Sequence, residues 1–239
     1  MNTTELAGVI LDQLLPRHCL LCGQFSADSN VCQPCTAGLP RSEYACSRCG
    51  LPVRSVHDLI CGLCLHKPPP WQHAIAGLIY RFPVDQLVCR FKFGRNLACG
   101  EILANELLLQ IRKKVPAAPD FIVPVPLHRS RHFFRSFNQA DLLARVLGKS
   151  LEIPVNASLL HRVRRTRAQS GLDARHRRQN LKGAFSFSKK PGKLPDNCHV
   201  ALVDDVCTTG ETLAACTRVL NKGKVKNVSI WVAARAPPP

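Results

Sequence analysis

The sequence predicts an α/β protein, in which a parallel sheet carries helices on both faces, preceded by a small metal-binding region. Two observations lead to this fold class. Eight of the 13 cysteines form four Cys-x-x-Cys pairs, and all eight lie before residue 65. Beyond residue 71, apolar segments typical of strands alternate with segments of helical periodicity, which is the pattern of parallel strands joined by crossover helices.

The eight paired cysteines form two similar modules, residues 19–35 and 46–64, with Gly23 and Gly50 at equivalent places after the leading pairs. Four pairs in succession favour zinc over disulfides or redox motifs. The pairing stays open, because sequential and cross-braced sites would use the same eight ligands. We expect two closed structural Zn²⁺ sites. Their ligands are Cys19, Cys22, Cys32, Cys35, Cys46, Cys49, Cys61 and Cys64.

The N-terminal residues give no sign of export. No apolar run reaches 18 residues, so no ordinary transmembrane helix is expected. Residues 5–15 are apolar but include Glu5 and Asp12, and they lack the basic start of a secretory signal, so we expect a short amphipathic helix. We therefore predict a cytoplasmic protein without membrane insertion. A reducing compartment also argues against disulfides.

A stiff linker with three consecutive prolines, residues 66–71, separates the cysteine-rich region from the rest. We place the domain boundary there, with an N-terminal helix and the zinc modules in 1–70 and the α/β domain in 71–239. The charge changes at the same point, because the first part holds five Lys or Arg and five acids, and the second holds 28 and 11. The net charge of +17 favours a polyanionic partner over a merely solubilising surface.

The elements of the second part follow from apolar periodicity and from end signals. The helix at 97–114 ends in three basic residues, which suit a helix C-terminus, and the helix at 137–148 stops at a glycine. The continuous apolar run at 199–206 is typical of a strand buried on both faces. In chain order we expect strands at 74–80, 120–126, 157–163, 183–187, 199–206 and 225–234, and helices at 84–93, 97–114, 137–148 and 210–223.

The segment VALVDDVCTTGET, residues 200–212, gives the main indication of function. The buried strand brings Asp204 and Asp205 to its carboxyl end, where ligands bind in open α/β sheets. The next loop leads into a helix N-terminus, which suits a phosphate. Two carboxylates beside a phosphate cradle suit the diol of a ribose 5-phosphate; the alternative is an ordinary turn with acidic surface residues. The candidate ligand residues are Asp204, Asp205, Thr208, Thr209, Gly210, Glu211 and Thr212.

This segment resembles the signature of the type I phosphoribosyltransferases at all thirteen positions. The resemblance implies a type I phosphoribosyltransferase-like fold with phosphoribosyl pyrophosphate (PRPP) and Mg²⁺ as ligands. It implies that Asp204 and Asp205 hold the ribose hydroxyls and that the Thr-Thr-Gly loop holds the 5-phosphate. Cys207 departs from the family pattern, and we interpret it as inert, because the neighbouring acids raise the pKa of its thiol.

Other segments resemble one subfamily, the ComF-like proteins and the GntX group. These combine an N-terminal double zinc ribbon with a phosphoribosyltransferase-like domain, and they are linked to competence, DNA uptake and the use of DNA as a nutrient. Residues 123–144 are similar to their hallmark, with Ser136 where glycine is usual. Residues 80–96 and 162–185 match as well, so the resemblance covers most of the chain.

The same resemblance implies the residues that face the pyrophosphate. Residues 161–182 hold eight Lys or Arg and one acid, and they lie where this fold has a hood; we expect a hood or a nucleic-acid contact there rather than inert surface. Asn138 and Gln139 are expected only to cap the next helix. The pyrophosphate loop comprises Pro126, Leu127, His128 and Arg129, and the further candidate anion ligands are Lys92, Arg135, Arg175 and Arg178.

Three functions fit these features. The first is a ComF-like protein that binds PRPP or a nucleotide, and single-stranded DNA on a basic face where Phe133, Phe134 and Phe137 lie among arginines. The second is an active phosphoribosyltransferase, a glycosyltransferase that displaces pyrophosphate with a base or an amine. The third is an adaptor whose zinc modules dock a helicase or another DNA-processing protein. Phosphoribosyltransferase folds serve both enzymes and ligand sensors, so all three remain open here.

Overall fold

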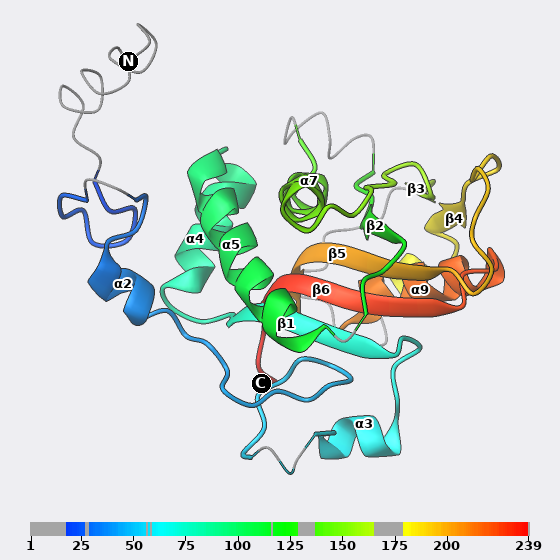
Figure 1. Cartoon of the computed structure of the whole chain (residues 1–239), viewed down its shortest axis with the longest axis horizontal. Coiled ribbons are helices and arrows are strands. Elements are labelled where there is room, and N and C mark those ends of the chain that lie inside the picture. Colours follow the sequence, from blue (N-terminus) through cyan, green and yellow to red (C-terminus); the bar gives the residue numbers. More distant parts are fainter. Residues whose placement is uncertain are drawn as a thin grey trace, which may run out of the picture.

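A four-stranded parallel sheet forms the centre of the computed structural model, with strand order β1-β6-β5-β2 (Figure 1). The predicted parallel sheet is therefore confirmed. Its strands are β1 (His73–Ile79), β2 (Phe121–Pro124), β5 (His199–Cys207) and β6 (Asn227–Arg235). The structure describes residues 18–26, 29–55, 57, 59–115, 117–128, 137–164 and 179–238.

Helices cover both faces of this sheet, as the sequence predicts. On one face, α5 packs against β1 and α7 packs against β5 and β2; on the other face, α9 packs against β5 and β6 (Figure 1). Gly77 permits the close approach of α5, because a Cβ at this position would lie 2.9 Å from the backbone nitrogen of Leu107. The helices are α4 (Val84–Phe93), α5 (Leu97–Lys114), α7 (Gln139–Leu151) and α9 (Glu211–Lys222).

Asparagines cap two of these helices: α5 has the predicted bounds, whereas α7 begins at Gln139 instead of 137 and continues through Gly148 to Leu151, so the expected stop at the glycine is wrong. The side chain of Asn96 accepts a hydrogen bond from the backbone of Cys99 at the start of α5. The side chain of Asn138 accepts one from the backbone of Ala140 at the start of α7, and its Nδ2 also donates to the carbonyl of Val125. Asn138 therefore caps its helix, as expected, and also ties the helix to the chain beyond β2.

The two strands expected around the basic stretch form a separate antiparallel pair, β3 (Leu160–Arg162) and β4 (Phe185–Phe187). They are shorter than expected and do not join the parallel sheet. Arg162 lies over the ring of Phe185, with 5.2 Å between the guanidinium carbon and the ring centroid. Most of the connecting basic segment, residues 165–178, lies outside the described residues, as does the helix expected at 5–15.

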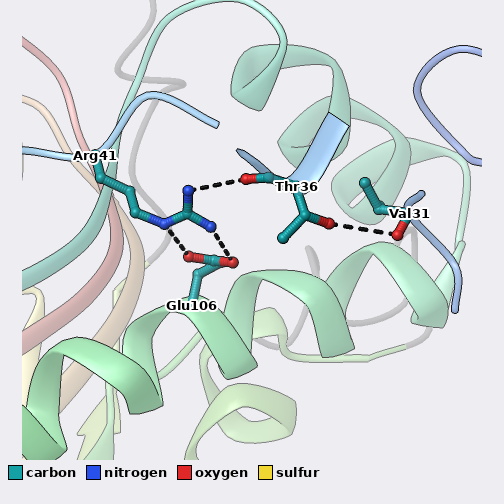
Figure 2. Close-up of polar contacts among 4 residues, drawn as sticks. All are labelled: Val31, Thr36, Arg41 and Glu106. Carbon is teal, nitrogen blue, oxygen red and sulfur yellow. Dashed lines mark hydrogen bonds and ion pairs between the residues drawn. The ribbon is translucent and has the colours of Figure 1, made fainter. Parts of the chain in front are cut away.

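The cysteine-rich region contains two short helices, α2 (Gln33–Ala37) and α3 (Gly62–His66). Arg41 ties the chain after α2 to α5, because its guanidinium makes two hydrogen bonds of 2.7 and 2.8 Å to the carboxylate of buried Glu106 (Figure 2). The same guanidinium donates to the carbonyl of Thr36. A buried carboxylate needs such a partner, so this bidentate pair fixes where the region sits on the α/β fold.

Among the described helices, none is both long enough and apolar enough to cross a bilayer.

Candidate functional site

The turn from β5 to α9 brings the predicted acid pair and the predicted phosphate loop together at the carboxyl end of the sheet. Asp205 is buried, Asp204 is half-buried, and Thr208 and Thr209 are exposed. Gly210 has a φ of +78° as the N-cap of α9, a left-handed conformation that favours glycine. The turn therefore exposes a helix N-terminus directly beyond two carboxylates, the arrangement that the sequence predicts.

The two carboxylates are held by their own backbone and by one cation. Oδ1 of Asp204 accepts a hydrogen bond from the amide of Asp205, and Oδ1 of Asp205 accepts one from the amide of Val206. Nζ of Lys92, from α4, lies 2.9 Å from Oδ1 of Asp205. The structure therefore brings Lys92, one of the four candidate anion ligands, to the acid pair.

Burial and the neighbouring Asp205 carboxylate raise the pKa of Asp204 to about 7, although Lys92 favours the charged form. Asp204 therefore changes its charge near neutral pH. Burial also raises the pKa of the Cys207 thiol to about 11, with a smaller contribution from Asp204. A buried thiol that stays protonated is a poor nucleophile.

The predicted pyrophosphate loop lies beyond β2, the strand that pairs with β5. The backbone of Val125 continues this pairing by donating to the carbonyl of Val203. Pro126, Leu127 and His128 then line a cavity of about 910 Å³. This cavity also faces a group of basic side chains. They are Arg145, His161, Arg162, Lys189 and Lys190.

Part of the predicted site lies outside the described residues, namely Arg129, Arg135, Arg175 and Arg178, together with Phe133 and Phe134. Phe137 packs against Phe91 in the core, with ring centroids 5.7 Å apart. Its place beside the arginines in the sequence therefore does not make it part of a stacking surface.

Two residues that the sequence analysis did not single out contact the phosphate loop. The guanidinium of Arg235 donates to the carbonyls of Cys207 and Thr208. The ring of Trp71 lies beside Gly210, where an added Cβ would be 3.1 Å from its Cη2. The available signal for Arg235 was a charged residue directly after the apolar run 230–234, at the same edge of the sheet as the acid pair.

The cysteines form two four-sulfur clusters, and the ligands are sequential within each module. In both clusters all four sulfurs lie within 4.8 Å of one another, and the contacts Cys22–Cys32 and Cys49–Cys61 measure 3.7 and 3.6 Å. A tetrahedral zinc with bonds of about 2.3 Å separates its sulfurs by about 3.8 Å. All thirteen cysteines are free of disulfides.

Four thiolates around zinc leave no open position, so these are structural sites, and each can contribute on the order of 10 kcal/mol to folding. Backbone groups support the sulfurs. The amide of Leu21 donates to Sγ of Cys19 at 3.4 Å, and the amide of Cys61 donates to Sγ of Cys46 at 3.3 Å. The donor set and its spacing therefore fit structural Zn²⁺.

Comparison with known protein families gives two matches that follow one another along the chain. Residues 10–65 match the double zinc ribbon domain, and residues 98–238 match the phosphoribosyl transferase domain. The second match covers more than half of the chain and contains both the acid pair and the phosphate loop.

Curated relatives resemble the chain over nearly its whole length. DNA utilization protein YhgH of Escherichia coli O157:H7 is 36% identical over 92% of this chain and 98% of its own. Competence protein F of Haemophilus influenzae is 37% identical over 88% of this chain and 92% of its own. Competence protein ComFC of Bacillus subtilis is 27% identical over 91% of this chain and 95% of its own. With its two zinc ribbons and its type I phosphoribosyltransferase fold, the chain belongs to the ComF/GntX-like family of double-zinc-ribbon phosphoribosyltransferase-domain proteins.

Proposed function

We propose that the turn from β5 to α9 binds the phosphoribosyl group of PRPP or of a nucleotide, and that the protein uses this site in handling single-stranded DNA during DNA uptake or utilisation. The observation that carries the proposal is the direct succession of two carboxylates and an exposed helix N-terminus in residues 204–212. The family match and the names of the relatives support it.

Each chemical group of the proposed ligand has a set of protein groups that would bind it. Asp204 and Asp205 accept hydrogen bonds from the two ribose hydroxyls. The amides and hydroxyls of the loop, with the positive end of the α9 dipole, hold the 5-phosphate. We expect Lys92 and the backbone of the loop beyond β2 to face a pyrophosphate on the anomeric carbon. Carboxylate and pyrophosphate oxygens suit Mg²⁺, which supplies charge neutralisation when bound.

Single-stranded DNA fits the basic cavity beside this site. The part of the chain after residue 70 carries the whole net positive charge, and the cavity of about 910 Å³ presents Lys189 and Lys190 next to the predicted pyrophosphate loop, whereas Arg145 pairs with Asp141 in its wall. Backbone phosphates would lie along these side chains, so a strand would pass close to the phosphoribosyl site.

Phosphoribosyl transfer is the second candidate function, and the match to the phosphoribosyl transferase domain favours it. In that reaction the bond from the anomeric carbon to pyrophosphate breaks, pyrophosphate leaves with the electron pair, a bond to the acceptor nitrogen forms, and that nitrogen loses its proton to water. Charge neutralisation and orientation dominate such a step, so the residues above would suffice. Incubation with Mg²⁺–PRPP and a panel of bases and amines separates the two functions, because only an enzyme releases pyrophosphate with an acceptor.

Removing both acids should remove PRPP binding. We expect the double variant Asp204→Asn, Asp205→Asn to bind Mg²⁺–PRPP at least a hundredfold more weakly than wild type in calorimetric titration, because both ribose hydroxyls lose a charged acceptor (about 1.5–3 kcal/mol each). The control Glu101→Gln, Asp196→Asn makes the same charge change at exposed positions and should bind like wild type. Equal affinity in all three proteins would reject the proposed site.

The titration of Asp204 predicts opposite pH dependences for stability and for binding. Its pKa is raised to about 7 in the folded protein from an ordinary value near 3.8. The folded protein therefore favours the protonated carboxyl of Asp204. This contribution to the free energy of unfolding is fully present below pH 4 and is lost as the pH rises through 7. Asp204→Asn should stabilise the ligand-free protein in urea unfolding by roughly 1–3 kcal/mol at pH 8.5, and by much less at pH 4.5.

The same titration makes binding stronger with increasing pH, because the charged carboxylate accepts the hydroxyl hydrogen bonds better. Wild-type affinity for Mg²⁺–PRPP should rise between pH 6 and 8. An affinity that stays flat across this interval, or a stability difference that shrinks at high pH, would show that Asp204 does not titrate as inferred.

The basic cavity predicts a salt-dependent affinity for single-stranded DNA. Fluorescence anisotropy with labelled oligo-dT should give a linear fall of log affinity with log salt concentration. Lys189→Gln, Lys190→Gln should reduce that slope by about 1.4, at roughly 0.7 per lost phosphate contact. Lys113→Gln, Lys149→Gln removes the same charge at the far ends of α5 and α7 and serves as control. Equal slopes for both pairs would place the DNA elsewhere.

A further inference from the structure

We infer that the second zinc site supports the phosphate-binding turn, with Arg235 as the positioning residue between them. Zinc bound by Cys46, Cys49, Cys61 and Cys64 would then control the affinity of the turn for its ligand. The identity of that ligand rests on the proposed function, whereas the mechanical link rests on contacts between described residues alone.

Arg235 bridges the zinc cluster and the turn. It is the last residue of β6 and is 8% exposed. On one side its Nε donates to the carbonyl of Cys49, a zinc ligand, at 2.9 Å. On the other side its Nη1 donates to the carbonyl of Cys207 at 2.9 Å and to the carbonyl of Thr208. One planar guanidinium therefore fixes backbone groups of both segments, and its geometry allows little independent movement.

The carbonyls that Arg235 holds determine where the phosphate-binding amides point. In a planar trans peptide, the C=O of one residue and the N–H of the next point in opposite directions. Because the C=O groups of Cys207 and Thr208 point at Arg235, the N–H groups of Thr208 and Thr209 are turned away from it. Arg235 thereby orients two amides of the proposed phosphate cradle without contacting the ligand.

Trp71 makes a second link between the same two segments. Its Nε1 donates to the carbonyl of Arg48 at 2.6 Å, between the cysteines of the leading pair. Its ring lies against Gly210 on the other side, close enough that a Cβ there would be 3.1 Å away. Trp71 is 5% exposed, so the indole is held in place by packing. The loop is therefore supported at both its beginning and its end.

The two carbonyls that Arg235 and Trp71 contact, those of Cys49 and Arg48, both belong to the knuckle 47–50, which the zinc ligands Cys46 and Cys49 define. The carbonyl of Ser47 accepts from the amide of Ala74 at 2.8 Å, and a Cβ at Gly50 would lie 3.5 Å from that of Ala76, so the knuckle rests on β1. Such a module is too small to have a core of its own, and its conformation depends on the metal.

The first zinc cluster provides an internal comparison. It lies beside α4, where Arg90 donates to the carbonyl of Leu20. Arg41 makes an analogous bridge from the chain after α2 to Glu106 on α5, and its printed contacts are with Glu106 and Thr36 (Figure 2). Both bridges use a guanidinium, so they form a matched pair for substitution.

The first experiment compares Arg235→Lys with Arg41→Lys. Both variants keep the positive charge and lose the guanidinium fork. Hydrogen exchange of the 207–214 peptide in the ligand-free protein should become at least tenfold faster in Arg235→Lys and stay unchanged in Arg41→Lys. Calorimetric affinity for Mg²⁺–PRPP should fall at least tenfold in Arg235→Lys alone, while both proteins keep two zinc ions per chain.

The second experiment removes zinc without touching the knuckle that contacts Arg235. Cys61→Ser, Cys64→Ser should lose one zinc ion, speed exchange at 207–214 and weaken Mg²⁺–PRPP binding by a similar factor. Cys32→Ser, Cys35→Ser also loses one zinc ion and should leave exchange at 207–214 within twofold of wild type. This pair of variants decides the question if Arg235→Lys does not fold.

The two proposals fail in different ways. If wild type does not bind Mg²⁺–PRPP, the proposed function fails, and the exchange measurements on ligand-free protein still test the link. If exchange at 207–214 is the same in wild type, Arg235→Lys and Cys61→Ser, Cys64→Ser, the zinc site does not support the turn and the inference is wrong, whatever the affinity for PRPP.

Discussion

The parallel pairing of β5 with β6 is the interaction on which the remaining features depend. Its register places Asp204 beside Val232 and Cys207 beside Arg235, so the acid pair, the phosphate loop and the bridging arginine all reach one edge of the sheet. A shift by one residue would turn every side chain of β5 to the opposite face. Successive apolar residues of β5 pack into opposite helical layers, with Ala201 and Val203 on one face and Val200 and Leu202 on the other.

At that edge of the sheet two carboxylates, which are unfavourable to bury, are stabilised by backbone amides and by one lysine. Asp205 is buried next to Asp204, and each carboxylate accepts a hydrogen bond from the next amide along the chain. Lys92 neutralises part of this charge from α4. Burying two adjacent carboxylates in this way is less favourable than burying apolar side chains, so the acid pair lowers the stability of this edge of the sheet.

The sequence was most informative where all the signals that determine an element lie within that element's own segment. The strand, loop and helix at 199–223 were predicted closely because a buried apolar run, a glycine and a helical period follow one another there. The same holds for α5, with its basic C-terminus, and for Asn138 as a cap. The cysteine spacing also predicted both clusters, although only the fold showed that the ligands are sequential.

Features that depend on distant partners could not be predicted in the same way. The strands β3 and β4 carried a strand pattern, but whether they would join the sheet depended on how the chain returns between them. Phe137 lies near arginines in the sequence and packs against Phe91 in the fold, because the start of α7 turns it inward. Arg235 has its partners 186 and 28 residues away, at Cys49 and Cys207, so only the assembled structure brings them together.

The cysteines outside the two clusters affect how metal is loaded. Cys99, Cys198, Cys207 and Cys216 are all buried, and burial raises the pKa of each thiol, whereas Cys89 on α4 is exposed. Once the α/β fold has formed, four of the five surplus sulfurs are therefore protonated and hidden from incoming ions. Zinc that reaches an already folded chain then meets the eight cysteines of the two clusters and a single competing thiol, that of Cys89.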